Sequence, residues 1–307
     1  DLVESGRRPS WHASVLDGSV VDANGHWAKL SAAGRVDIKG VWELSRFAWV
    51  YPLVRAWVLD GEARHVERFW ALLEDWMEAN PPNRGPQWMC GQEASLRLIA
   101  VAFALQAFRA HPATTDARLL LTARLATATA ERIRAHLGYA LSQQNNHGLS
   151  EALGLFTAGA LWPHLEDAAG WRDQGLETLF PQVDALVDAD GGFSQHSTNY
   201  HRLFLQLLTW AEVVLVAEGE RLPPQTRDQP FCGKRRGDRY RQAATINRGR
   251  EHGGRFGEAV VAGDPERRGR HHHRAFIRAA FDGTDEPVDQ HGNQAGGRAF
   301  DPRAARQ

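Results

Sequence analysis

The chain has 307 residues, of which 43% are hydrophobic and 11 are tryptophan, enough to build one large core or two ordinary ones. A formal net charge of -1 excludes a generally basic chain, so we expect no nucleic-acid partner. No apolar run approaches the ~20 residues of a membrane span, so no such span is expected. Two cysteines give neither a disulfide framework nor a zinc spacing.

The elements expected along the chain are almost all helical. Residues 1–40 are rich in Gly, Ser, Asp and Asn, which predicts an irregular lead-in with room for a short strand. Farther on, apolar residues recur every three or four positions, with polar, Gly or Pro breaks between runs. This pattern predicts helices at Trp42–Leu59, His65–Ala79, Gln92–Phe108, Asp116–Leu137, Gly148–Leu161, Trp171–Val187 and Tyr200–Val216.

Such a succession of amphipathic helices, with no β-rich interruption, predicts an all-α domain over residues 41–224, built from helical hairpins packed side by side. A ring of hairpins, the α/α toroid, and an open solenoid both agree with the pattern. No repeat of fixed period distinguishes between them.

Residues 225–307 have a different composition. They contain 17 Lys and Arg against 11 Asp and Glu, whereas residues 1–224 contain 19 and 26. They also lack Leu, Trp, Met and Ser, which is unusual for a packed domain of this size. We therefore expect an Arg- and Gly-rich tail of low hydrophobicity, either disordered or read in a shifted frame of a GC-rich gene.

Three polar side chains crowd the sequence before the helix expected at Gly148, namely Asn145, Asn146 and His147. The simplest interpretation of Asn146 is a helix cap, because Asn commonly accepts hydrogen bonds from the first backbone N–H groups. One cap would suffice, however. Glu151 follows His147 by one turn, close enough to accept an imidazole N–H, either in a surface ion pair or as a carboxylate that orients a functional histidine.

A second polar cluster precedes the last expected helix. Residues 195–201 are dense in hydrogen-bonding groups and follow a turn signal at 190–192. Tyr200 lies on the apolar stripe of the helix, where a tyrosine is usually a core residue. Such a density of polar groups is costly to bury without purpose, which favours a site near Tyr200 and His201.

Two acid–base pairs stand at helical spacing, Glu43 with Arg46 and Glu93 with Arg97. We expect both to be structural ion pairs lining an inner face. No phosphate loop, Ser or Cys nucleophile motif or zinc-helix motif is present, so no cofactor and no metal site are expected. The adjacent histidines at 271–273 cannot all face one ion from a regular element.

At these motifs the chain resembles the heparinase II/III family of polysaccharide lyases, including its alginate and oligoalginate lyase relatives. The resemblance extends from about Asp37 to Glu218. It rests on Asp37-Ile38-Lys39, on residues 42–46, on Asn80-Pro81-Pro82 with Gly85 and Trp88, on Glu93 with Arg97, on Asn145-Asn146-His147 with Glu151, and on 190–192 with Asn199-Tyr200-His201.

The resemblance implies an N-terminal α/α toroid, expected here to be incomplete, followed by a C-terminal β-sandwich, in whose place we expect the tail at 225–307. It implies an acidic, uronic-acid polysaccharide as the substrate, such as heparan sulfate or alginate, and β-elimination without a cofactor. Asn146 and His147 would neutralise the uronate carboxylate, and Tyr200 would shuttle protons. A periplasmic or secreted location is also implied; the oligomeric state is not. The implied substrate-binding residues are Glu93, Arg97, Asn145, Glu151 and His201.

Two other functions remain open at this point. An α/α-toroid glycoside hydrolase would use paired acids, with Glu43, Glu93 and Asp190 as candidates. A glycan-binding protein without catalysis is the other. A lyase is favoured because the amide, imidazole and phenol suit proton abstraction beside a carboxylate.

Overall fold

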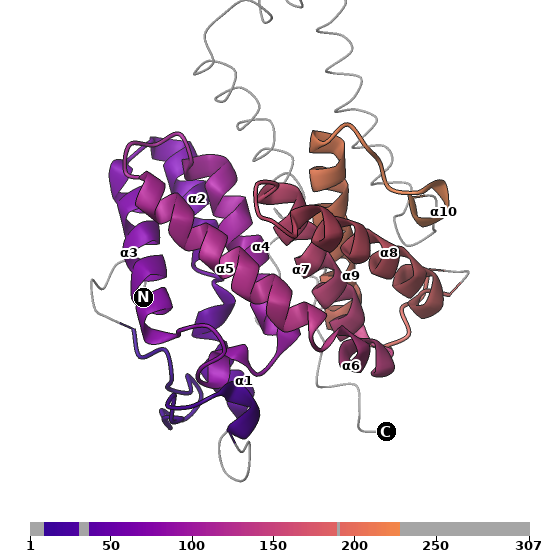
Figure 1. The fold of residues 1–307 in the computed structure, drawn as a ribbon, viewed down its shortest axis with the longest axis horizontal. Helices are drawn as coiled ribbons and strands as arrows, with labels where there is room; N and C mark the ends of the chain where they lie inside the picture. The colour runs from indigo at the N-terminus through magenta and orange to yellow at the C-terminus, as the bar shows by residue number, and fades with distance from the viewer. Residues whose placement is uncertain (1–8, 31–36, 189–190, 228–307) are drawn as a thin grey trace, which may run out of the picture.

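The structure is a computed structural model that describes residues 9–30, 37–188 and 191–227 (Figure 1). Within these ranges there is no β-strand, only isolated bridges such as Ala13 with Val20. The helices are α1 (Ile38–Trp42), α2 (Val50–Asp60), α3 (Ala63–Ala79), α4 (Gly91–Phe108), α5 (Asp116–Arg134), α6 (Leu137–Ser142), α7 (Asn146–Leu161), α8 (Ala168–Leu186), α9 (Thr198–Ala217) and α10 (Pro224–Arg227). The expected all-α class is confirmed.

Three short 3-10 turns accompany the helices: η1 (Trp27–Lys29), η2 (Leu44–Arg46) and η3 (Pro86–Trp88). Of the expected tail at 225–307, only residues 225–227 are described, and they belong to α10. The rest of the tail, with the histidines at 271–273, lies outside the described residues.

The helices form hairpins arranged in an arc. Helices α2, α4, α7 and α9 lie side by side in that order, and α3, α5 and α8 pack against this row (Figure 1). The pairs α2 with α3, α4 with α5 and α7 with α8 are the helical hairpins expected from the periodicity. The described part is therefore an incomplete α/α toroid.

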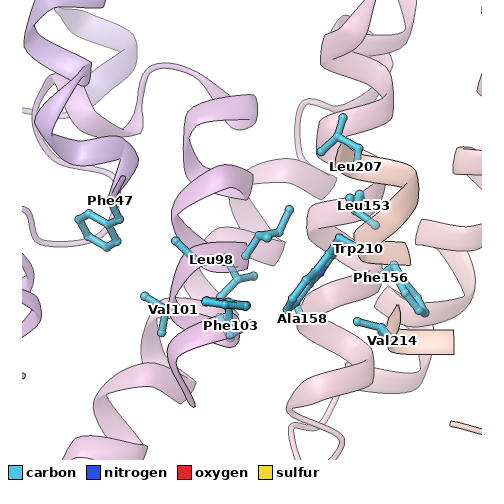
Figure 2. Close-up of a cluster of buried hydrophobic side chains, with 14 of the residues drawn as sticks. Phe47, Leu98, Val101, Phe103, Leu153, Phe156, Ala158, Leu207, Trp210 and Val214 are labelled. Carbon is cyan, nitrogen blue, oxygen red and sulfur yellow. The ribbon is translucent and has the colours of Figure 1, made fainter. Parts of the chain in front are cut away.

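The core lies between neighbouring hairpins, and the row α4, α7 and α9 supplies much of it (Figure 2). The backbones of α7 and α8 approach each other closely, since a Cβ on Gly175 would lie 2.8 Å from the carbonyl oxygen of Ala152. The buried side chains at these seams include Leu98, Val101 and Phe103 of α4, Leu153, Phe156 and Ala158 of α7, and Leu207, Trp210 and Val214 of α9.

The single helix predicted at Trp42–Leu59 was wrong. Helix α1 ends at Trp42, η2 follows, and Phe47 has a left-handed φ of 60° before α2 begins. The ring of Phe47 is fully buried and meets Trp76 edge to face, with centroids 5.2 Å apart. Aromatic burial of this kind stabilises a strained backbone that local periodicity does not reveal.

The helix predicted at Asp116–Leu137 was too long, because α5 ends at Arg134. His136, with φ −133° and ψ 10°, interrupts the chain before the short helix α6, which was not predicted. Leu137 and Ala140 of α6 are buried, and this tertiary contact supports a helix of only six residues.

The described lead-in packs against the toroid. Trp11 is buried, and its indole N–H donates to Oδ2 of Asp75 on α3 at 2.6 Å. Gln87 of η3 donates through Nε2 to the carbonyl oxygen of Trp11 at 2.7 Å. These bonds join the irregular N-terminal stretch to the segment that leads into α4.

Candidate active site

The start of α7 differs by one residue from the expected cap. Asn145, in extended backbone geometry, is the N-cap, and its Oδ1 accepts a hydrogen bond from the backbone N–H of His147 at 2.9 Å. Asn146 is therefore the first residue of the helix and not its cap. The capping interpretation accounts for Asn145 and leaves the side chain of Asn146 to another role.

Asn146 is held by residues from two other parts of the chain. Its backbone N–H donates to Oε1 of Gln195 at 3.0 Å, and its side-chain Nδ2 faces Oε1 of Gln92 on α4. Ser150, one turn later, donates to the carbonyl oxygen of Asn146 at 2.8 Å and lies 3.2 Å from Oε1 of Gln92. These contacts fix Asn146, which is 2% exposed.

His147 is half-buried beside Cys90 and Glu151. Its Nδ1 lies 3.9 Å from Sγ of Cys90 and 4.0 Å from Oε1 of Glu151, the latter too far for a hydrogen bond. Burial lowers the pKa of His147, although the charge of Glu93 opposes this effect. At neutral pH the ring is therefore uncharged and offers one N–H donor. Neutralising a uronate carboxylate, the role that the resemblance implies for His147, would instead use the charged ring.

Glu151 is buried at the contact between α4 and α7, with 4% of its surface exposed. Burial raises its pKa to about 7, and the nearby Arg132 and the backbone N–H of Gln92 offset part of this rise. The contact between His147 and Glu151 therefore lies inside the protein and not on its surface, and at 4.0 Å the carboxyl group makes no hydrogen bond that would orient the ring. Arg132 itself donates to the carbonyl oxygens of Trp88 and Met89.

Glu93, in the first turn of α4, pairs with Arg46 of η2 through two hydrogen bonds, from Nε at 2.8 Å and from Nη2 at 3.0 Å. Arg46 also donates to Glu43 at 2.5 Å, so the expected Glu43–Arg46 pair is confirmed. The pairing raises the pKa of Arg46. One guanidinium thus neutralises both of the described acids that the hydrolase hypothesis would use; its third candidate, Asp190, lies outside the described residues.

The expected pair of Glu93 with Arg97 does not form. Arg97 is fully buried, donates to the carbonyl oxygen of Gln87, and lies over the ring of Trp76 at 5.0 Å. Burial lowers its pKa to about 10. Spacing of i and i+4 permitted the pair, but Arg46 reaches Glu93 from outside the helix with better geometry, and Arg97 stabilises the aromatic core.

Tyr200 and His201 are the third and fourth residues of α9. Tyr200 is 42% exposed, so it is not the core residue that its place on the apolar stripe would suggest. His201 meets Phe204 edge to face, with ring centroids 6.2 Å apart. Gln195, five residues before Tyr200, joins this segment to the first residue of α7.

Two residues of this arrangement were not among the predicted site residues. Gln92 had no visible motif, since its role depends on the contact between α4 and α7. Gln195 belonged to the polar cluster before α9, and that density was the signal that could have identified it. Among residues 9–30, 37–188 and 191–227, no group of three or more His, Cys, Asp or Glu could hold a metal, and no helix is long and apolar enough to cross a membrane.

The helical arc with polar groups at the starts of α4, α7 and α9 defines the chain as part of an α/α-toroid protein. The family profile described as heparinase II/III N-terminus matches residues 21–222. The chain belongs to the heparinase II/III family, and the resemblance inferred from its motifs is confirmed.

Several characterised proteins are similar to this chain. The heparin-sulfate lyase of Bacteroides stercoris is 27% identical over 180 residues, which is 52% of this chain and 26% of that protein. The heparin-sulfate lyase of Pedobacter heparinus is 27% identical over 165 residues, 52% of this chain and 24% of that protein. The chain thus spans about a quarter of the length of these relatives.

Solved structures show the same fold. A crystal structure of heparinase III matches with a TM-score of 0.51 and 22% identity, over 69% of this chain and 32% of that chain. The crystal structure of heparan sulfate lyase HepC from Pedobacter heparinus matches with a TM-score of 0.50 and 24% identity, over 65% of this chain and 31% of that chain.

Proposed function

We propose that this chain is the toroid part of a lyase that cleaves a uronic-acid-containing glycosaminoglycan by β-elimination. The observation that carries the proposal is the meeting of helix starts: Asn146 and His147 begin α7, and Gln195 ties Asn146 to the segment that leads into Tyr200. The names of the relatives, heparin-sulfate lyases, favour a heparan-type glycan over alginate.

The first requirement of the reaction is to stabilise a carboxylate. The C5 proton of a uronate lies α to its carboxylate, and removing that proton increases the negative charge there. Asn146 and the uncharged ring of His147 can each donate an N–H to the carboxylate oxygens. Because Asn146 is only 2% exposed, we expect it to meet one small group, such as a carboxylate, and not a broad sugar face.

The second requirement is a group that carries a proton to and from the substrate. Tyr200 is exposed enough to contact a substrate. In its ionised form the phenol takes the C5 proton, the C4–C5 double bond forms, and the bond from C4 to the glycosidic oxygen breaks. The same phenol then gives its proton to the departing oxygen. Atoms and charge balance with no water, metal or added nucleophile.

The other predicted substrate-binding residues have different parts in this proposal. His201 is partly exposed next to Tyr200 and could contact the sugar. Asn145, Glu93 and Glu151 act by building the site, through the cap of α7, the pair with Arg46 and the contact with α4. Arg97 has no part, because it is enclosed by the core.

The test is to incubate the 307-residue chain with heparan sulfate, hyaluronan and alginate and to follow the far-ultraviolet absorbance of the unsaturated product. We expect the product from a glycosaminoglycan, and its loss in Tyr200→Phe and Asn146→Ala. Tyr139→Phe is the matched control, since Tyr139 on α6 is exposed and carries no role here.

Other results would contradict the proposal in specific ways. New reducing ends without the absorbing product would indicate a hydrolase. Binding of uronic oligosaccharides without turnover would indicate a glycan-binding protein. Neither product nor binding with any of the three glycans would reject the proposed function altogether.

A further inference from the structure

The hydroxyl group of Ser150 lies near two possible hydrogen-bond partners, one on Asn146 and one on Gln92. The hydroxyl of Ser150 lies 2.8 Å from the carbonyl oxygen of Asn146 and 3.2 Å from the terminal amide of Gln92. A serine hydroxyl has one proton and can donate it to one of these partners only. The carbonyl oxygen four residues earlier is the nearer acceptor and the usual one for serine in a helix.

With its proton so used, the hydroxyl oxygen of Ser150 can only accept from Gln92. The atom of Gln92 that faces Ser150 must then be Nε2. A terminal amide exchanges its oxygen and nitrogen positions by a half turn about its last bond, so this arrangement keeps the same positions of heavy atoms. The two protons of Nε2 suit two acceptors, and the second neighbour is the side-chain amide of Asn146.

The orientation of Asn146 follows from that of Gln92. If Nε2 of Gln92 donates, Asn146 must offer Oδ1 to it, after the same half turn. Three bonds then form, from Ser150 to the carbonyl oxygen, from Gln92 to Ser150, and from Gln92 to Asn146. With Oε1 of Gln92 in that position, the single proton of Ser150 allows only two. A buried polar group left without its bond costs about 1–3 kcal/mol, so the three-bond arrangement is favoured.

We propose that Gln92 is a positioning residue that turns the amide of Asn146 so that its NH₂ group faces the substrate carboxylate. This inference rests on the proposed function, because the carboxylate is the group that both N–H donors would meet. Gln92 itself acts through Asn146. Gln195 does not compete for the side chain, since it accepts from the backbone N–H.

The sharpest test is Gln92→Glu, because an ionised carboxylate can only accept. It would draw the NH₂ group of Asn146 away from the substrate, and we expect kcat to fall by about 10- to 100-fold, the worth of a hydrogen bond to a charged group, with a smaller change in KM. Gln106→Glu, the same change at the other end of α4, is the control for charge. If Gln92 were instead the acceptor, Gln92→Glu would keep or raise activity, which would overturn the proposal.

A pH profile separates positioning from structural damage. When the introduced carboxyl group takes up a proton it can donate again, so the activity of Gln92→Glu relative to the parent chain should recover as pH falls. Taking the ratio at each pH removes the titrations that both proteins share, including those of His147 and Glu151. A ratio that stays constant with pH would contradict the positioning role.

A measurement independent of catalysis keeps the two proposals distinguishable. In chains labelled with ¹⁵N only in Asn and Gln side chains, we expect the NH₂ protons of Asn146 to exchange with water faster than those of Gln92. The opposite order would overturn the inference even if the chain is an active lyase. The expected order in a chain that neither binds nor cleaves glycans would reject the proposed function and leave the orientation established.

Discussion

The carboxyl group of Glu151 on α7 occupies the space in which a side chain at position 91 of α4 would lie. A Cβ on Gly91 would be 2.5 Å from Oε2 and 2.6 Å from Oε1 of Glu151, closer than side-chain atoms approach in proteins. Gln92 follows Gly91 directly, and its backbone N–H helps to hold the carboxyl group. A side chain at position 91 would therefore force the buried carboxyl group of Glu151 to move.

We expect Gly91→Ala to destabilise the fold by about 1–3 kcal/mol, the usual cost of overpacking, even though alanine is the better helix former. Urea unfolding measures the change. In a Glu151→Ala background the same substitution should cost little, because the group it collides with is gone. An equal cost in both backgrounds would mean that this contact is not the cause.

Glu151 also predicts a specific dependence of stability on pH. Its pKa rises from 4.5 to about 7 in the fold, so the folded chain keeps this proton while the unfolded chain releases it. Stability therefore falls as pH rises from about 4.5 to 7, by on the order of 3 kcal/mol in all. Glu151→Gln should remove this loss and be the more stable protein at pH 8, with little difference at pH 4. Unfolding by urea across this range measures it, and a constant difference between the two proteins would be the contrary result.

The helices could be predicted from the sequence because their apolar faces repeat with the helical period and Gly or Pro separates them. The break at Phe47 could not, since its left-handed backbone is stabilised by Trp76, far away in the sequence. Helix α6 could not either, because six residues hold their helix only through buried contacts of Leu137 and Ala140.

The candidate site was predictable to the extent that its motifs are contiguous. The sequence predicted a polar helix start from Asn145, Asn146 and His147, but it did not show which of the two adjacent asparagines is the cap. The partner of Glu93 was mistaken because spacing along one helix favoured Arg97, whereas Arg46 approaches from η2. No site role was predicted for Gln92 for the same reason: its contacts cross from α4 to α7.

Gln195 offers a test of the link between α7 and the Tyr200 segment. Gln195→Leu leaves the backbone N–H of Asn146 without its acceptor, which should cost about 1–3 kcal/mol. Gln195→Glu keeps an acceptor and adds a negative charge at a helix start, so its stability should equal or exceed that of the parent chain. Amide hydrogen exchange at Asn146 reports the bond directly. Faster exchange in the Glu variant than in the Leu variant would contradict the assignment.

The last prediction concerns the two acids that share Arg46. Glu93 is buried and doubly bonded to the guanidinium, whereas Glu43 is about half-exposed at the other side of it. Removing a buried partner leaves the remaining charge poorly solvated, and partial exposure of Arg46 moderates this, so Glu93→Ala should destabilise by about 2 kcal/mol. Glu43→Ala should change stability by less than about 0.5 kcal/mol, as exposed pairs do.

Variants at the same two positions, Glu43→Ala and Glu93→Gln, also separate a lyase from a hydrolase. In a lyase that uses Asn146, His147 and Tyr200, Glu43→Ala should retain its activity, and Glu93→Gln, which keeps the shape of the side chain, should lose only what its lower stability explains. A hydrolase that used these acids would lose nearly all turnover in both variants while remaining folded. Activity measured beside circular dichroism at a temperature where each variant is folded distinguishes the two outcomes.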